Sequence, residues 1–262
     1  MNRAVRNLIK TVLKRFDIGI TRYSELQRLK EIGKPGDDLA LLLSLPNRHA
    51  AQLLNVIKKS KSQLGQDLFA LSESEFKRGG YFVEFGATNG VESSNTHLLE
   101  KEFEWRGILA EPAKSWLSEL KKNRNCHIDT GCVWRDSNTT LTFNEVYSAE
   151  LSTIDSFSAT DKHVEKRMNG TKYDVRSISL LDLLQKYDAP KIIDYMSVDT
   201  EGSEFEILSN FDFGRYDIRV ITCEHNFTPD RDKILSLMNR NGYVRTHEDV
   251  SKFDDWYVKT AS

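Results

Sequence analysis

The sequence predicts an α/β fold in which helices cover both faces of a mainly parallel, doubly wound sheet. From Ser62 onwards, short apolar segments typical of buried parallel strands alternate with longer segments of helical periodicity. The chain has 262 residues, 39% of them hydrophobic, which is enough to bury one substantial core and to carry an appendage. We therefore expect an α/β domain over residues 62–262 and a separate helical extension over residues 1–61.

The extension is expected to open with a basic amphipathic helix. Its apolar residues recur at helical spacing, at Val5, Leu8, Ile9, Val12, Leu13 and Phe16. Residues 1–61 contain 13 Lys/Arg and 5 Asp/Glu, a local charge of +8 that leaves −10 on the rest of the chain. Such a helix suits an anionic membrane surface, a groove on a partner protein, or packing on its own domain.

The elements of the domain follow from runs of apolar residues and from turn residues between them. Strands are expected at 81–85, 106–112, 126–133, 191–199 and 218–225, each apolar and short. Helices are expected at 66–76, 93–103, 115–123, 179–187, 203–211 and 230–241. Ser203 and Glu206 form a capping-box pattern at the start of one of them. Residues 242–249 and 254–260 predict a closing antiparallel pair, and the polar region 133–175 predicts a loop with a hairpin near 139–146.

Composition excludes several broad classes of protein. The net charge of −2 and the pI near 6.3 argue against a dedicated nucleic-acid-binding protein. The basic N-terminus has no uninterrupted apolar segment, so neither a signal peptide nor a membrane span is expected. Three cysteines without metal-binding spacing favour reduced thiols. Together these features predict a cytoplasmic protein, with peripheral contact to the inner face of the membrane as one option for the extension.

A glycine turn between the first strand and the next helix predicts a nucleotide-like cofactor. Its glycines, Gly86 and Gly90, permit a left-handed backbone and close approach of a ligand. The dinucleotide pattern GxGxxG is absent, because Thr88 and Val91 stand where its second and third glycines would be. A glutamate, Glu92, also lies near the start of the helix, where it would repel a pyrophosphate.

S-adenosylmethionine fits this turn better, because it carries a sulfonium and an ammonium group but no phosphate. Glu84, Gly86, Thr88 and Gly90 make an E-x-G-x-T-x-G turn. Glu111 follows the second strand, about 20 residues further on, where a carboxylate accepts hydrogen bonds from both ribose hydroxyls. The third strand ends at the same edge, so Asp129 is a further candidate cofactor-binding residue.

A second group of polar residues follows the fourth and fifth strands and carries the candidate chemistry. Asp199 and Glu201 follow one strand, and Glu224 and His225 end the next, so these side chains are expected to converge. Three arrangements remain open for removing a proton from an alcohol. His225 acts as the base, Asp199 acts as the base, or Asp199, Glu201 and Glu224 bind Mg²⁺ that acidifies the hydroxyl.

Several ordered motifs resemble the FkbM family of S-adenosylmethionine-dependent methyltransferases. They are "SQLGQDLFAL", "FVEFGATNG", "SNTHLLEKEFEWRGILAEP", "SVDTEGSEFEIL", "ITCEHN" and "NGYVRTHED…DDWYV", which together span about residues 62–259. The resemblance implies a class I methyltransferase fold with a seven-stranded Rossmann-like sheet. It also implies methyl transfer to a hydroxyl, often on a sugar of a polysaccharide or glycosylated natural product. By the same resemblance Gln63, in "SQLGQD", folds over the cofactor.

Two other functions compete with an O-methyltransferase that acts on a glycan. A nicotinamide-dependent sugar dehydrogenase or epimerase is disfavoured by Val91 and by the lack of an evident YxxxK pair. A cofactor-binding but inactive partner of a glycosyltransferase, attached through the N-terminal helix, is disfavoured by the intact glycine turn and the acidic residues around it.

Overall fold

The computed structural model describes residues 36–159 and 163–260. The predicted N-terminal amphipathic helix lies outside these residues, so its proposed contacts with a membrane or a partner stay predictions. One compact unit spans Leu41–Ser262. Leu41, Leu53 and Ile57 are buried in the core of this unit, so the predicted boundary between residues 61 and 62 falls inside it.

The centre of the unit is a seven-stranded sheet of order β10-β11-β9-β8-β1-β2-β3. Its strands, in chain order, are β1 (Tyr81–Phe85), β2 (Arg106–Ala110), β3 (His127–Asp129), β8 (Ile192–Val198), β9 (Asp217–Glu224), β10 (Tyr243–Thr246) and β11 (Asp254–Lys259). β11 alone runs opposite to the other six strands, as the predicted closing pair requires. From β1 the chain first adds β2 and β3 on one side, and later adds β8 and β9 on the other, so the strand order reverses between β1 and β8. Sheets of this type bind ligands at that position.

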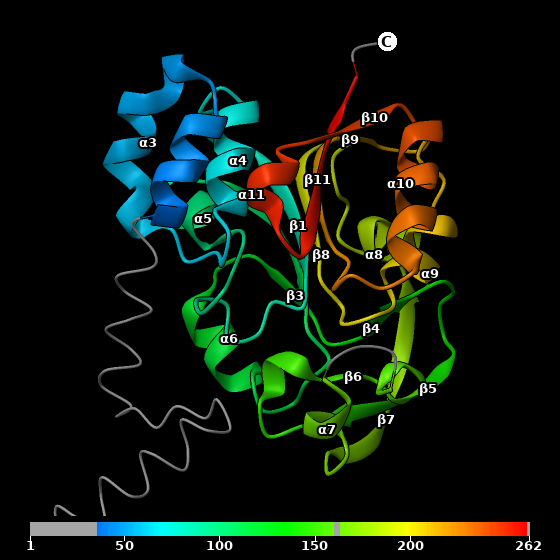
Figure 1. Ribbon diagram of the computed structural model, residues 1–262. Helices are drawn as coiled ribbons and strands as arrows, with labels where there is room; N and C mark the ends of the chain where they lie inside the picture. The colour runs from blue at the N-terminus through cyan, green and yellow to red at the C-terminus, as the bar shows by residue number, and fades with distance from the viewer. Residues whose placement is uncertain (1–35, 160–162, 261–262) are drawn as a thin grey trace, which may run out of the picture. The chain divides into compact units, whose positions relative to one another are not determined.

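Helices cover both faces of this sheet (Figure 1). One face carries α8 (Leu180–Lys186), α9 (Glu204–Ser209) and α10 (Asp230–Arg240) over Val83 and Phe85. The other carries α3 (Ala50–Val56), α4 (Gln66–Glu73), α5 (His97–Phe103) and α6 (Leu117–Asn123) over Phe82 and Leu109. Alternate residues of β1 thus enter opposite cores, because successive side chains of a strand point to opposite faces. Both faces are buried, which is why these strands are apolar throughout.

A second sheet of order β4-β7-β5-β6 replaces most of the loop predicted for residues 133–175. Its strands are β4 (Cys132–Trp134), β5 (Thr140–Glu145), β6 (Thr153–Ile154) and β7 (Thr171–Ser179), and the short helix α7 (Val164–Arg167) precedes β7. The prediction of a single strand at 126–133 is therefore wrong, because these residues contribute to two strands, β3 and β4, in different sheets. The chain turns at Thr130 and Gly131, where Asp129 accepts a hydrogen bond from the Gly131 N–H at 2.7 Å, and enters the second sheet.

The predicted capping box at Ser203 is also wrong in its contacts. Ser203 is the residue before α9, but its side chain makes no capping hydrogen bond. The carboxylate of Glu204 turns back instead and accepts hydrogen bonds from the N–H groups of Thr200 and Gly202. The turn after β8 is thereby fixed by a residue inside the helix. The remaining helix, α11 (Glu248–Ser251), leads into β11.

Candidate active site

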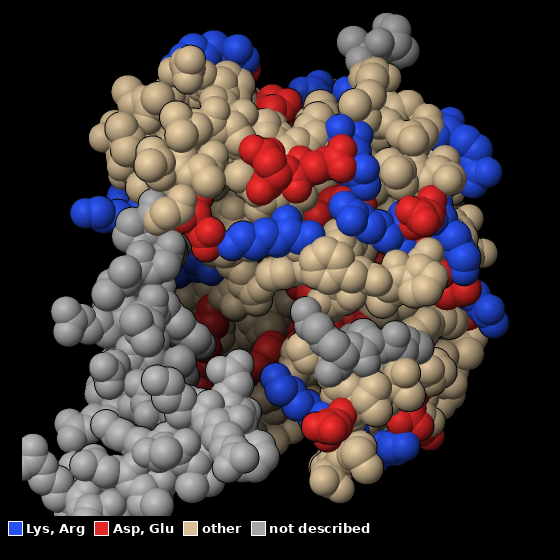
Figure 2. Space-filling model, viewed as in Figure 1, with Lys and Arg blue, Asp and Glu red and all other residues tan. Residues whose placement is uncertain are grey.

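A cavity of about 310 Å³ opens at the carboxyl ends of β1, β2, β8 and β9 and is closed from the other side by the second sheet. In Figure 2 a hollow in the molecular surface has acidic atoms at its floor. The lining carboxylates are Glu84, Glu111, Glu150, Asp199, Glu201 and Glu224. Lys166 is the one lysine or arginine among the described residues of this wall. The lining therefore suits a cationic ligand without phosphate groups.

The turn after β1 brings the backbone to the wall of the cavity. Gly86 has φ +72°, and a Cβ atom there would lie 2.1 Å from the Asp199 carbonyl oxygen, so no other residue fits without displacing the chain. Thr88 also has a left-handed backbone, with φ 48°, and both residues line the cavity. Gly90 does not line it. A Cβ atom at Gly90 would collide with Arg124 and Leu120, so this glycine serves the packing of α6.

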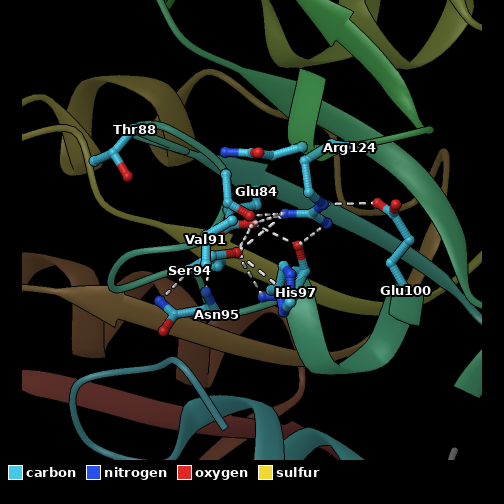
Figure 3. A network of polar contacts seen from close by, with 12 residues as sticks. Glu84, Thr88, Val91, Ser94, Asn95, His97, Glu100 and Arg124 are labelled. Carbon is cyan, nitrogen blue, oxygen red and sulfur yellow. Dashed lines mark hydrogen bonds and ion pairs between the residues drawn. The ribbon is translucent and has the colours of Figure 1, made fainter. Parts of the chain in front are cut away.

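Glu84 reaches the cavity but its carboxylate is occupied by a buried network (Figure 3). It accepts hydrogen bonds from Ser94 Oγ, the Asn95 N–H and Thr96 Oγ1. The Arg124 guanidinium lies 3.7 Å away and is fully buried. Burial raises the pKa of Glu84, and Arg124 and the hydrogen bonds oppose that shift. Glu84 therefore mainly stabilises the segment that follows the glycine turn.

Arg124 organises this network, and the sequence offered no local signal for it. Its guanidinium donates to Glu100, to the Gly90 carbonyl and to the hydroxyls of Ser94 and Thr96. All these partners lie at least 24 residues away in the chain.

Glu111 lies at the wall where the second strand ends, as predicted. Its two carboxylate oxygens accept hydrogen bonds from the N–H groups of Thr88 and Ala113, each at 2.8 Å. The side chain is 4% exposed, and burial raises its pKa to about 7. The Thr88 hydrogen bond joins the glycine turn to Glu111, so the predicted ribose-binding carboxylate and the predicted turn form one structure.

Asp199, Glu201 and Glu224 converge at the end of the cavity where β8 and β9 end, on the other side of β1 from Glu111. One side-chain oxygen from each lies within 4.8 Å of the others. Burial raises the pKa of Asp199 well above its usual value, and the Glu201 charge adds to this effect. Burial likewise raises the pKa of Glu224, with the Asp199 charge as the next cause. Each of the two carboxylates therefore disfavours ionisation of the other.

Arg167 enters this cluster from the end of α7, the short helix that precedes β7. Its Nη2 lies 2.7 Å from Glu201 Oε2, and both side chains are buried. Asn226, at the end of β9, donates to the same oxygen at 3.5 Å. The predicted loop region thus supplies a charged residue to the site, and its sequence contained no signal for this.

His225 does not line the cavity. It follows Glu224, and because neighbouring side chains of a strand point to opposite sides, Glu224 faces the cavity while His225 faces β11. Its Nδ1 accepts a hydrogen bond from the Phe227 N–H at 3.0 Å, and its Nε2 lies 3.7 Å from Asp255 Oδ1. Burial lowers the pKa of His225. The geometry therefore gives no support to His225 as the base.

Of two further residues predicted to bind the cofactor, one lines the cavity and the other does not. Gln63 lines the cavity from the loop before α4. Asp129 lies outside it, because its carboxylate is paired with Lys186 at 2.7 Å and lines a separate cavity of about 670 Å³ between α6 and the second sheet. The break between β3 and β4 directs it there.

A family model described as "Methyltransferase FkbM domain" matches residues 84–245, which contain the glycine turn and the carboxylate cluster. No curated protein matches the chain. No helix within the described ranges is long and apolar enough to cross a membrane.

Several solved methyltransferase structures are similar to the chain at low identity. Precorrin-6y C5,15-methyltransferase from Geobacter metallireducens is 11% identical with a TM-score of 0.40, over 73% of this chain and 85% of that one. A TehB-like SAM-dependent methyltransferase from Corynebacterium glutamicum is 10% identical with a TM-score of 0.40, over 82% and 97%. A SAM-dependent methyltransferase from Aquifex aeolicus is 11% identical with a TM-score of 0.36, over 78% and 96%. These TM-scores are below 0.5, so the assignment of the chain depends on the family match.

Proposed function

Because the chain belongs to the FkbM family of S-adenosylmethionine-dependent methyltransferases, we propose that it methylates a hydroxyl group of a sugar in a polysaccharide or glycoconjugate. The observation that carries this proposal is the adjacent pair of carboxyls, half-buried Asp199 and buried Glu224, at the end of the cavity opposite Glu111. An alcohol is a weak nucleophile at neutral pH and needs a group that takes its proton as it attacks.

The residues around the cavity fit S-adenosylmethionine. Glu111 is placed to accept hydrogen bonds from the ribose hydroxyls, and Gly86 and Thr88 are placed to hold the adjoining part of the cofactor. The acidic lining stabilises positive charge. When bound, the cofactor supplies an electrophilic methyl group and leaves as the neutral thioether.

Asp199 is the proposed base. We infer that Asp199 and Glu224 hold one proton between them, because two carboxylates this close disfavour each other's ionisation. One carboxylate of the pair is then free to accept the proton of the acceptor hydroxyl, whose oxygen forms the new bond to the methyl carbon. Raised pKa values make this pair a stronger base than an exposed carboxylate. The proton therefore moves from the acceptor oxygen to a carboxylate oxygen of the protein as the bond forms.

The acceptor end of the cavity supports a sugar. Polar side chains there, including Ser152, Asn226 and Lys166, can hydrogen-bond to hydroxyl groups, and Leu151 and Phe253 provide apolar surface for the ring. The family assignment argues against the alternative of a nicotinamide-dependent sugar dehydrogenase or epimerase.

Mg²⁺ at Asp199, Glu201 and Glu224 is the alternative way to acidify the acceptor hydroxyl. Their oxygen atoms are close enough together for a shared cation. However, the Arg167 guanidinium lies 2.7 Å from Glu201 and opposes a second cation there. We therefore favour direct proton removal. Turnover abolished by EDTA and restored by Mg²⁺ would support the metal version instead.

The test is transfer of radiolabelled methyl from the cofactor to candidate glycans, with a gain of about 14 Da per site, the mass of one CH₂. Asp199→Asn should bind the cofactor and lose about 10²- to 10⁴-fold in turnover. His225→Asn is the matched control, because its amide oxygen can still accept from the Phe227 N–H, and turnover should stay within about threefold of wild type. Near-normal turnover of Asp199→Asn would contradict the assignment.

A further inference from the structure

Arg167, the last residue of α7, connects two parts of the cavity wall through its side chain. It is 1% exposed. Its Nη2 pairs with Glu201 Oε2 at 2.7 Å, and its Nε donates to the Leu151 carbonyl at 2.7 Å. The carbonyl of Arg167 in turn accepts a hydrogen bond from Asn144 Nδ2 of β5 at 3.0 Å. One side chain thus joins the turn after β8 to residues 149–152, which line the cavity.

The turn that Arg167 contacts has an unusual backbone. Glu201 has φ +58° and Gly202 has φ +122°, and a left-handed backbone at a glutamate costs about 1–2 kcal/mol. Other side chains also hold this turn. Thr153 Oγ1 of β6 donates to the Glu201 carbonyl at 2.9 Å, and the Glu204 carboxylate accepts from the Thr200 N–H at 2.8 Å. Strand β6 and helix α7 therefore each contribute one of the contacts that fix residues 199–202.

Stability alone is a weak reason for a buried ion pair at this place. Removing two charges from water costs several kcal/mol per ion, and their attraction only roughly offsets that cost. Apolar residues of similar volume would stabilise the fold as well. What the pair adds is geometry, because a guanidinium that binds two partners at once holds them at a set distance and angle.

We propose that Arg167 is a positioning residue for methyl transfer, which holds Glu201 and Leu151 together and so fixes Asp199 relative to the wall that receives the acceptor. This inference rests on the proposed function of the Asp199 end of the cavity. The contacts of Arg167 with Glu201 and Leu151 do not involve the end of the cavity that would bind the cofactor ribose. There, Glu111 is held by the N–H groups of Thr88 and Ala113. Loss of Arg167 should therefore affect turnover and leave cofactor binding intact.

The first arm of the test measures steady-state kinetics with an unmethylated glycan acceptor and calorimetry with the demethylated cofactor. Arg167→Met should lower kcat at least 30-fold and raise the acceptor KM, while the cofactor Kd changes less than threefold. Arg167→Lys keeps the charge and one hydrogen bond, so it should recover about tenfold of the lost kcat. Lys77→Met is the matched control, since Lys77 also pairs with a buried carboxylate, Asp194, but at the opposite end of the sheet, and its kcat should be unchanged.

The second arm needs no acceptor and measures amide hydrogen exchange of the peptide that contains residues 199–203. Exchange there should accelerate at least tenfold in Arg167→Met and stay unchanged in Lys77→Met. If Arg167→Met is poorly folded, the same comparison is made with Arg167→Lys and with Glu201→Gln. Unchanged exchange in this peptide would overturn the proposal, whether or not a sugar proves to be the acceptor. A parallel loss of cofactor affinity, melting temperature and kcat would also overturn it, because it would show a purely structural role.

Discussion

Replacing Glu111 tests whether the cavity binds the cofactor as the geometry indicates. The carboxylate accepts two backbone hydrogen bonds at 2.8 Å and faces the cavity with its remaining lone pairs. Hydrogen bonds to charged groups contribute about 1.5–3 kcal/mol each, so loss of one such bond to the ribose corresponds to about a 10- to 100-fold rise in Kd. We expect this rise for Glu111→Ala with the demethylated cofactor, measured by isothermal titration calorimetry.

The dependence of this affinity on pH gives a sharper test. Burial raises the pKa of Glu111 to about 7, so the carboxyl is protonated in much of the free protein at pH 6 and ionised at pH 8. The ionised form is the better acceptor for two hydroxyls, and apparent affinity scales with the fraction of the competent form. Affinity should therefore increase about tenfold from pH 6 to pH 8.

Glu111→Gln should remove this pH dependence, because the amide does not titrate. Glu102→Gln, which changes a surface glutamate paired with Lys59, serves as the control and should retain it. Equal affinities of wild type and Glu111→Ala would show that Glu111 is outside the binding site. A pH dependence that persists in Glu111→Gln would assign it to another group.

Three further predictions concern the scaffold around the cavity. Gly86→Ala should lower the melting temperature more than Gly79→Ala, because both have a left-handed backbone but only Gly86 has a carbonyl oxygen 2.1 Å from the new Cβ; equal losses would contradict the close contact. Arg124→Gln should cost about 3–5 kcal/mol in urea unfolding, since it leaves buried carboxylates without their cation, and a loss below about 1 kcal/mol would refute this role. Asp254 has its pKa raised from 3.8 to about 7 by burial, so the folded state binds its proton more tightly and stability should fall as pH rises from about 4 to about 7. Asp254→Asn should flatten this decline in thermal melts, and an unchanged slope would exclude Asp254 as its source.

The sequence by itself determined the order of the elements and one end of the site. Strands buried on both faces must be apolar, and a turn that approaches a neighbouring strand needs glycine, so β1, Gly86 and Glu111 could be read from local residue types. The convergence of Asp199 and Glu224 also followed from the sequence, because parallel strands end at one edge.

Only the tertiary structure decided which of the remaining polar residues reach the cavity. His225 follows Glu224 directly, yet the pleat of β9 turns it toward Asp255. The short polar strands of the second sheet carry little apolar periodicity, and their pairing partners lie far along the chain, so the region 133–175 resembled a loop. Arg124 and Arg167 pair with glutamates 24 and 34 residues away. Such contacts leave no local pattern, because the energy that selects them comes from burial and charge pairing after the chain has folded.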